Sequence, residues 1–514
     1  MWCACRHSRP SAPASTAPAC LCEGSSVRVK DSPRTWLCLL GLVVCLRLVV
    51  AAFLPLSPDE AYYRIWALAP AASYLDHPPM VAAWIRLGIT LGGDDPLGVR
   101  LVGVLAGAGL SFFLFRAVRD LLPGAAPALA WRACALLQAT LALAIQSIVM
   151  TPDMPVLFFL SVLLWVMGRI VAGGSACWWL AVGLVAGLGF DSKYTAVLPV
   201  AGIGLWWLGQ SLWRRVPGQG RHWAAIAGGL VLAVLCVTPV LWWNATHGWA
   251  SFARQGGRTA DWHPGRAFQF LTELLVGQAG LMTPGIAAFF VWGQVRAWRQ
   301  ARQVPGAALL ACLVAVPACV FMQHAIGDRV QANWPVVIYP ALGVATALVG
   351  WRWGRWAIGG GLLVGTLVYG QALFAPLPLS SHTDVALRQM AGWRGLAADI
   401  GAVARPGEFV AACDYGTAAE LATVLPGRTV VGMEPRWALF NLPHDVTGGG
   451  IMVCNPRRPF DTAVFASINR LGTVMRGRRG RVAEPVSLYR VRLRDDLSTA
   501  QRQAMARLPV AGGG

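Results

Sequence analysis

The sequence predicts an α-helical protein that crosses a membrane many times and carries a small C-terminal α/β domain. Three observations predict this fold class. Of the 514 residues, 56% are hydrophobic and only 13% are charged, whereas soluble domains average about 25% charged residues. About eleven segments are apolar over the roughly 20 residues that a membrane-spanning helix needs. Arg residues gather in alternate loops between these segments, which is typical of a polytopic protein with a basic inner side.

Residues 1–34 predict a cytoplasmic tail without regular structure. They are rich in Ser, Ala, Pro and Cys, and they contain no apolar run of the kind that a signal peptide has. Cys3, Cys5, His7, Cys20 and Cys22 are candidate zinc ligands, but their spacing matches no familiar four-ligand site. The other cysteines lie mostly inside predicted helices, and no disulfide framework is indicated.

Residues 35–376 predict the membrane module. If every span crosses, the Arg-rich loops face one side and the loops with Asp59, Asp153 and Asp328 face the other. The positive-inside rule makes the Arg side, and the N-terminus, cytoplasmic. The net charge of +19 is spread through short loops, which argues against a nucleic-acid partner. The fourth and fifth spans can also be read as one re-entrant pair. The spans are expected at 35–55, 98–116, 132–150, 154–171, 177–190, 194–212, 223–243, 270–293, 306–324, 333–350 and 356–376.

After residue 376 the composition changes, and a Pro-rich hinge leads into a segment with alternating helix-like and strand-like runs. This pattern predicts an extracytoplasmic α/β domain over 377–495, followed by a tail over 496–514. No Gly-rich phosphate-binding loop is present in the sequence. A role as a lid or stability domain and an acceptor-binding role are equally open for this domain. The runs are helix-like at 383–404 and 416–424 and strand-like at 409–413, 429–433 and 451–454.

The first outer loop, 57–97, is too long to be a plain connection. Ser57 and Pro58 suit the cap and first position of a helix, and Glu60 stands where a capping box needs an acid. Glu60 is therefore either a cap or a catalytic acid. Asp59 is either a first-turn acid whose charge the helix dipole stabilises, or a carboxylate held at the membrane surface facing a cavity. The helix that follows carries Tyr62 and Tyr63 and is expected to lie along the membrane interface.

Further polar residues stand at the outer ends of other spans. Asp153 follows Thr151 and Pro152, so it is again either a helix cap or a catalytic group. Lys193 breaks the charge bias of the outer side, and it either snorkels or binds an anion. The same exception is made by Arg254, Arg258, Arg266 and Arg329, which we expect to face an anionic ligand.

Six motifs occur in order between residue 57 and about residue 335. They are Asp59-Glu60-Ala61-Tyr62-Tyr63, Asp76-His77-Pro78-Pro79, Thr151-Pro152-Asp153, Ser192-Lys193-Tyr194-Thr195-Ala196, Trp243-Asn244-Ala245-Thr246-His247-Gly248-Trp249 and Asn333-Trp334-Pro335. Each motif is weak alone, but the ordered set is specific. Together they resemble bacterial membrane glycosyltransferases of the family 39/83 type. That group includes the dolichyl-phosphate-mannose–protein mannosyltransferase-like enzymes, the lipid A aminoarabinose transferases and the lipopolysaccharide galacturonosyltransferases.

The resemblance implies a GT-C fold in the bacterial inner membrane, with a polyprenyl-phosphate-linked sugar as donor and a glycolipid or glycan acceptor on the periplasmic side. It implies that Asp59 is the catalytic base, with Glu60 beside it and Asp153 as a second acidic residue. Some relatives bind a divalent metal, but no clear ligand cluster is visible in this sequence. The resemblance implies that Lys193 contacts the donor phosphate. Further candidate donor-phosphate ligands on the outer side are Tyr194, His77, Arg254, Arg258 and Arg329, and the candidate groove residues are Tyr62, Tyr63, Asp76, His247 and Asn333.

The chemistry agrees with this assignment on physical grounds. A sugar on a lipid phosphate already has a good leaving group, so the enzyme needs a base for the acceptor hydroxyl and cations for the departing phosphate. A polytopic transporter or lipid flippase is the alternative from another class, but its ionisable residues are expected near the bilayer midplane rather than at span ends. A protein O-mannosyltransferase is the second alternative.

Overall fold

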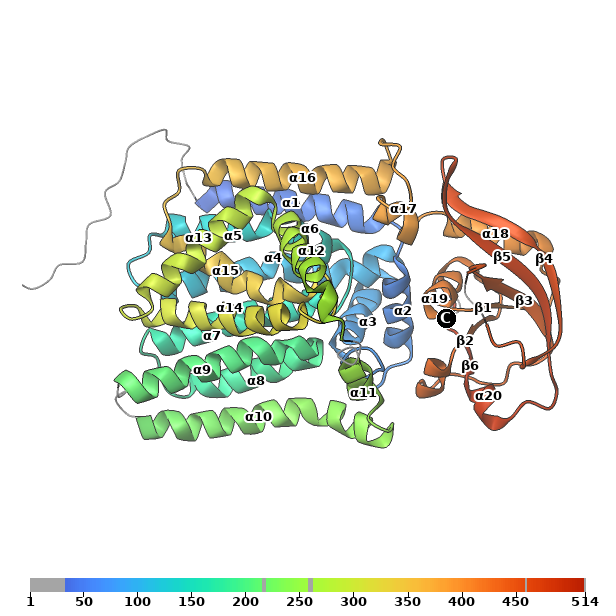
Figure 1. The fold of residues 1–514 in the computed structure, drawn as a ribbon, viewed down its shortest axis with the longest axis horizontal. Coiled ribbons are helices and arrows are strands. Elements are labelled where there is room, and N and C mark those ends of the chain that lie inside the picture. Colours follow the sequence, from blue (N-terminus) through green and yellow to red (C-terminus); the bar gives the residue numbers. More distant parts are fainter. Residues whose placement is uncertain (1–32, 215–218, 258–261, 458–459, 513–514) are drawn as a thin grey trace, which may run out of the picture.

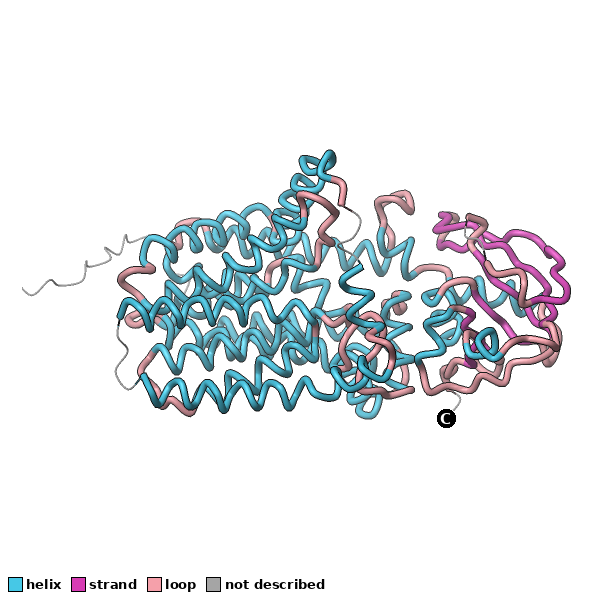
Figure 2. The backbone as a smooth tube through the Cα atoms, turned by 60° about the horizontal axis from the view of Figure 1, so that its bottom comes forward, coloured by secondary structure: helices cyan, strands magenta, loops and turns pink. Residues whose placement is uncertain are grey.

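The computed structural model describes residues 33–214, 219–257, 262–457 and 460–512. The candidate zinc ligands between Cys3 and Cys22, nearly all of the predicted tail and Arg258 lie outside these ranges. Figure 1 shows an elongated helical bundle with a sheet-containing domain at one end, and Figure 2 shows the same division from a second direction.

Seven helices of the described chain are long and apolar enough to cross a membrane, counting the 3-10 turn Tyr194–Ala196 with the helix that follows it. These helices confirm the polytopic fold class. They are α1 (Pro33–Phe53), α4 (Pro96–Leu121), α7 (Asp153–Val171), α9 (Val197–Arg214), α10 (Gln219–Thr246), α14 (Pro305–His324) and α16 (Gly354–Phe374).

Two segments expected as single straight spans are bent instead. Helices α5 (Pro127–Gln138) and α6 (Leu141–Ile148) meet at 66°, where the Thr140 hydroxyl caps the new helix. Helices α12 (Ala267–Met282) and α13 (Pro284–Gln300) meet at 106°. Pro284 has no N–H to continue α12, and Thr283 takes a left-handed φ of 68° at the corner. Counting each pair as one span gives up to nine spans in the described chain.

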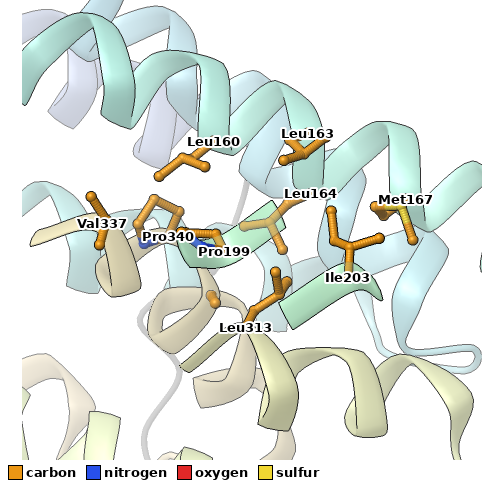
Figure 3. A pocket seen from close by; sticks show the side chains of 10 residues that line it. Leu160, Leu163, Leu164, Met167, Pro199, Ile203, Leu313, Val337 and Pro340 are labelled. Atoms are coloured by element: carbon orange, nitrogen blue, oxygen red, sulfur yellow. The ribbon is translucent and has the colours of Figure 1, made fainter. Parts of the chain in front are cut away.

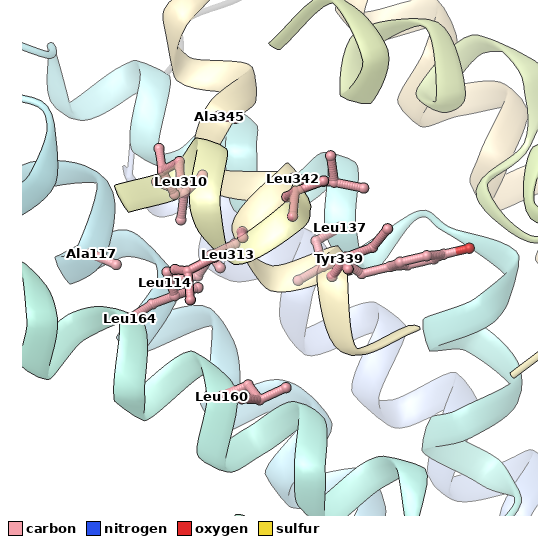
Figure 4. Close-up of a cluster of buried hydrophobic side chains, with 14 of the residues drawn as sticks. Leu114, Ala117, Leu137, Leu160, Leu164, Leu310, Leu313, Tyr339, Leu342 and Ala345 are labelled. Carbon is pink, nitrogen blue, oxygen red and sulfur yellow. The ribbon is translucent and has the colours of Figure 1, made fainter. Parts of the chain in front are cut away.

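The remaining two predicted spans are short helices. They are α8 (Trp178–Ser192) and the run η3 (Trp334–Ile338), α15 (Tyr339–Ala345) and η4 (Thr346–Leu348). Every residue of α15 is buried, and Figure 4 shows its Tyr339, Leu342 and Ala345 among leucines of α4, α5, α7 and α14. Figure 3 shows a narrow gap between helices, and all of the lining residues that it labels are apolar. We therefore regard this gap as a packing defect of the bundle.

The loop over 57–97 forms α2 (Pro58–Leu68) and α3 (Met80–Gly92). The expectation that the first of these lies along the membrane interface is wrong. All residues from Glu60 to Ala67 are buried, because α2 packs against both α3 and the C-terminal domain. Helices α2, α3 and α11 (Ala250–Gly257) lie at the end of the bundle that carries the sheet (Figure 1), with η2 (Pro264–Arg266) leading into α12.

The C-terminal domain contains one mixed six-stranded sheet in the order β4-β5-β3-β1-β2-β6. The central strand β1 pairs in parallel with β2 and β3, and the other pairs are antiparallel. Its strands are β1 (Phe409–Ala412), β2 (Val430–Met433), β3 (Gly449–Cys454), β4 (Phe465–Arg478), β5 (Arg481–Leu493) and β6 (Met505–Arg507), and its helices are α17 (Val385–Met390), α18 (Trp393–Val403), α19 (Tyr415–Val424), η5 (Pro435–Leu439) and α20 (Thr499–Gln503).

Three features of this domain differ from expectation. The helix expected over 383–404 breaks at Gly392, whose φ of 83° and contact with the Gly477 backbone leave no room for a side chain. The tail expected over 496–514 instead forms α20 and β6, because the buried Met505 and Ala506 complete the sheet beside β2. A disulfide joins Cys413, which follows the last residue of β1, to Cys454, the last residue of β3. The two cysteines directly follow Ala412 and Val453, which are paired in the sheet.

Candidate functional site

Asp59 stands near the start of α2 and is accessible to solvent. Its Oδ1 accepts a hydrogen bond from the Tyr415 hydroxyl at 3.0 Å. Crowding by protein atoms raises the pKa of Asp59, the hydrogen bond from Tyr415 opposes that rise, and the nearby Asp76 adds to it. A carboxylate with a raised pKa is a stronger base than an ordinary Asp while remaining open to a substrate.

Glu60 has a structural role, which answers the alternative left open by the sequence and corrects its assignment as a catalytic residue. It completes the capping box with Ser57 and accepts the backbone N–H of Met150 at 2.9 Å. Its two oxygens also pair with Arg100 at 2.6 and 2.7 Å, and neither side chain is exposed. A carboxylate enclosed in this way has no access to a substrate.

Three predicted site residues meet in one network although they are far apart in the sequence. The Lys193 ammonium pairs with Asp153 Oδ1 at 2.5 Å, and Asn333 donates to Asp153 Oδ2 at 2.7 Å. Asp153 and Lys193 are both buried. The network therefore fixes α7, α8 and η3 together, and its carboxylate is already occupied by donors.

Tyr63 links this network to Asp59. Burial raises the pKa of Tyr63 well above its usual value, and the charges of Asp59, Asp76 and Asp153 raise it further. Because all three charges act on one buried hydroxyl, the two candidate catalytic acids both lie near Tyr63.

Asp76 is the centre of a second network at the same end of the bundle. Its Oδ2 accepts from Arg436 at 2.9 Å and from the Tyr62 hydroxyl at 3.3 Å. Arg254, half exposed on α11, approaches Oδ1 at 3.6 Å, and Gln255 donates to the Asp76 backbone oxygen at 2.6 Å. Asp76 therefore joins the first loop to α11 and to the C-terminal domain.

The Trp243–Trp249 motif forms the turn that positions α11. Gly248 and Trp249 both take positive φ angles, 62° and 57°, so the chain reverses sharply after α10. The buried Asn244 accepts the Ser251 N–H at 3.2 Å, and His247 stacks on Trp243 with ring centroids 4.3 Å apart. His247 thus supports the turn. Tyr194 adds a contact through its hydroxyl, 2.6 Å from Ser251 Oγ.

The other predicted phosphate ligands differ in their surroundings. The guanidinium of Arg329 is paired with Glu273 at 2.6 Å on the surface, and the His77 ring lies 6.3 Å from that of Tyr63. Arg258 lies outside the described residues. Within the described ranges, no three His, Cys, Asp or Glu side chains are grouped to hold a metal ion.

The sequence interpretation missed Tyr415 and Arg436, the two side chains that the C-terminal domain brings to the site. Arg436 lies over the Tyr415 ring with its carbon 4.0 Å from the ring centroid and pairs with Glu434 at 2.8 Å. A signal was available, because both residues come directly after parallel strands, Tyr415 after β1 and Arg436 after β2. The carboxyl ends of parallel strands are where α/β sheets bind ligands.

Comparison with known proteins supports the resemblance seen in the motifs. The family model described as dolichyl-phosphate-mannose-protein mannosyltransferase matches residues 76–243. The lipid A galacturonosyltransferase RgtD of Rhizobium johnstonii is 24% identical over 285 residues, which are 55% of this chain. The match spans 58% of the length of that curated relative.

Two crystal structures of ArnT from Cupriavidus metallidurans have the same fold. The apo structure matches with a TM-score of 0.57 at 16% identity, and the structure bound to undecaprenyl phosphate matches with a TM-score of 0.58 at 15% identity. Each match covers 89% of this chain and 98% of the ArnT chain. These matches confirm the expected GT-C fold.

Proposed function

We propose that this chain is a membrane glycosyltransferase that moves a sugar from a polyprenyl-phosphate carrier to a hydroxyl of lipid A, or of another lipopolysaccharide or envelope glycan. The observation that carries the proposal is the accessible Asp59 carboxylate with a raised pKa, which lies near the buried Tyr63, as does the network of Asp153 and Lys193. The named activity of RgtD and the undecaprenyl phosphate bound to ArnT support the same donor and acceptor classes.

Asp59 acts as the base in a single displacement. It takes the proton of the acceptor hydroxyl while that oxygen attacks the anomeric carbon of the sugar. The bond between that carbon and the phosphate oxygen breaks, and the polyprenyl phosphate leaves with the electron pair. One displacement inverts the configuration of the anomeric carbon.

The leaving phosphate needs cations close to Asp59. Arg254 fits this role, because its side chain is 51% exposed and its distance of 3.6 Å from Asp76 leaves donors available to a ligand. Lys193 is held by Asp153, and its ammonium has further N–H donors that can reach a phosphate beside this pair. His77 follows Asp76 and lies within the same network.

The lipid tail of the donor fits an apolar groove between α12, α13, α14 and α15. This groove has a volume of about 460 Å³ and is lined by Met282, Phe290 and Phe321, among others. Pro335 also lines it, and it stands two residues after Asn333, which donates to Asp153. One lining residue of the groove is therefore close in sequence to the charged network.

We place the protein in a bacterial inner membrane with the N-terminus in the cytoplasm and the sheet domain in the periplasm. The disulfide Cys413–Cys454 supports this orientation, because disulfides form in oxidising compartments. The clustering of Arg in the loops at the opposite ends of the spans supports it independently.

The test is Asp59→Asn, measured as sugar transfer in membranes of a strain that lacks the gene and therefore retains both native substrates. We expect loss of transfer. Asp95→Asn is the matched control, because Asp95 caps α4 through the Gly98 N–H at 2.8 Å and Asn caps a helix equally well. Full transfer by Asp59→Asn at normal expression would remove Asp59 as the base.

Mass spectrometry of envelope lipids from the deletion strain identifies the substrates. A hexose, pentose or uronate missing from lipid A or another envelope glycan names both the sugar and the acceptor. A sugar missing instead from an envelope protein would favour the protein O-mannosyltransferase alternative.

A further inference from the structure

We propose that the C-terminal domain completes the catalytic site, with Tyr415 as the positioning residue that orients Asp59 and keeps it ionised. This inference rests on the proposed role of Asp59 as the base. It gives the domain a part in the reaction beyond that of a lid.

The domain meets the first loop at a contact that only glycine permits. A Cβ added to Gly416 would lie 2.8 Å from the Cβ of Pro58, so α19 and α2 begin directly against each other. Tyr415 is the first residue of α19 and Asp59 is the second of α2. This close approach allows the Tyr415 hydroxyl to reach Asp59 Oδ1 at 3.0 Å.

The Tyr415 side chain is fixed from several directions. Its ring contacts both the Arg436 guanidinium, at 4.0 Å, and the Tyr62 ring, at 4.6 Å. Arg436 is itself held by Asp76 at 2.9 Å and by Glu434 at 2.8 Å. Because Arg436 contacts Asp76 of the first loop as well as Tyr415 of the domain, the orientation of Tyr415 depends on the contact between the domain and the first loop.

The chain just before Tyr415 is also anchored. Asp414 caps α19 by accepting the Thr417 N–H at 3.0 Å, and Cys413 is tied to β3 by the disulfide. The hydroxyl is therefore presented by a rigid strand-to-helix junction, which lets one hydrogen bond determine the orientation of a carboxylate.

The hydrogen bond has two consequences for the base. It occupies Oδ1, while Oδ2 bonds to none of the described residues, so Oδ2 remains for the acceptor hydroxyl. It also stabilises the ionised carboxylate against the desolvation that disfavours it. Arg436 acts in the same direction through its charge.

The test is the pH profile of Tyr415→Phe, measured by sugar transfer to the native acceptor in membranes of the deletion strain. Phe keeps the ring that packs on Arg436 and Tyr62 and removes only the hydroxyl. A hydrogen bond to a charged group corresponds to roughly one pH unit or more. The acidic limb of the profile should therefore move to higher pH by about one unit, with about tenfold less transfer on that limb and near wild-type transfer at high pH.

Two further variants complete the test. Arg436→Gln should move the limb in the same direction, because it removes the charge that favours ionised Asp59 and releases the Tyr415 ring. Tyr489→Phe is the matched control. Tyr489 is on β5, in another part of the domain, where its ring packs against that of Phe460, so this substitution should leave the pH profile unchanged.

The outcomes separate this inference from the proposed function. Full activity of Asp59→Asn would overturn both. If Asp59→Asn is inactive and Tyr415→Phe keeps the wild-type profile, the role of Tyr415 is wrong while the base stands. A loss in Tyr415→Phe that is equal at every pH would reduce Tyr415 to a structural contact and would also overturn the inference.

Discussion

Replacing Arg100 with Met should destabilise the protein far more than replacing an exposed arginine. Arg100 makes two hydrogen bonds to Glu60 and donates to the backbone oxygens of Ala51, Leu54 and Pro55 at 3.0, 2.6 and 2.9 Å. Its removal leaves an ionised Glu60 without a countercharge in the interior. Breaking a buried pair from one side costs about 3–5 kcal/mol, and every 1.4 kcal/mol is a factor of about ten in the unfolding equilibrium.

A double-mutant cycle separates the charge from the packing. Glu60→Gln removes the charge and keeps one side-chain oxygen, which can still accept from either Ser57 or Met150, the donors to the two different oxygens of Glu60. Adding it to Arg100→Met should therefore recover part of the loss, with a coupling energy of about 1–3 kcal/mol. The free energy of unfolding can be followed by Trp fluorescence in mixed micelles, since the chain contains 24 Trp.

Arg86→Met is the control, because Arg86 is exposed on α3 and its loss should change stability by no more than about 0.5 kcal/mol. Two results would contradict the reasoning. One is an Arg100→Met cost below about 1 kcal/mol. The other is a double mutant that is no more stable than Arg100→Met alone, which would show that the Glu60 charge is not what the arginine balances.

Three further predictions follow from the same end of the molecule. Cys413→Ser should destabilise the C-terminal domain by about 4 kcal/mol, because the disulfide closes a separation of 41 residues. In intact cells that carry the wild-type protein, Cys413 and Cys454 should resist alkylation until a reductant is added. Wild-type transfer should fall, as pH drops, through a pKa above that of an ordinary Asp, since desolvation raises the pKa of Asp59, and a pH–rate profile checks this. Burial raises the pKa of Glu420 well above its usual value, so its contribution to stability is full below the unfolded pKa of about 4.3 and is lost as pH rises through the folded pKa. Glu420→Gln should then gain stability over wild type with rising pH, and equal unfolding curves at pH 5 and 8 would contradict this.

The sequence by itself determined the fold class and identified the candidate site residues at the ends of helices in the membrane module. Apolar length and Arg alternation predict the spans because a bilayer imposes one requirement on every crossing segment. The motifs around Asp59, Asp153 and Lys193 stand at helix ends, where local chemistry is visible without tertiary contacts. For Glu60, the Ser57 cap was readable for the same reason, since capping acts within four residues.

Only the tertiary structure decided what these residues meet. The partner of Glu60 is Arg100, 40 positions away, and the partner of Asp59 is Tyr415, 356 positions away. Helix α2 is buried rather than interfacial because a domain that begins more than 300 residues later covers it. Local patterns report which residues can ionise, cap or span. Which carboxylate is neutralised and which stays open to a substrate depends on long-range packing, because desolvation and ion pairing act through space and not along the chain.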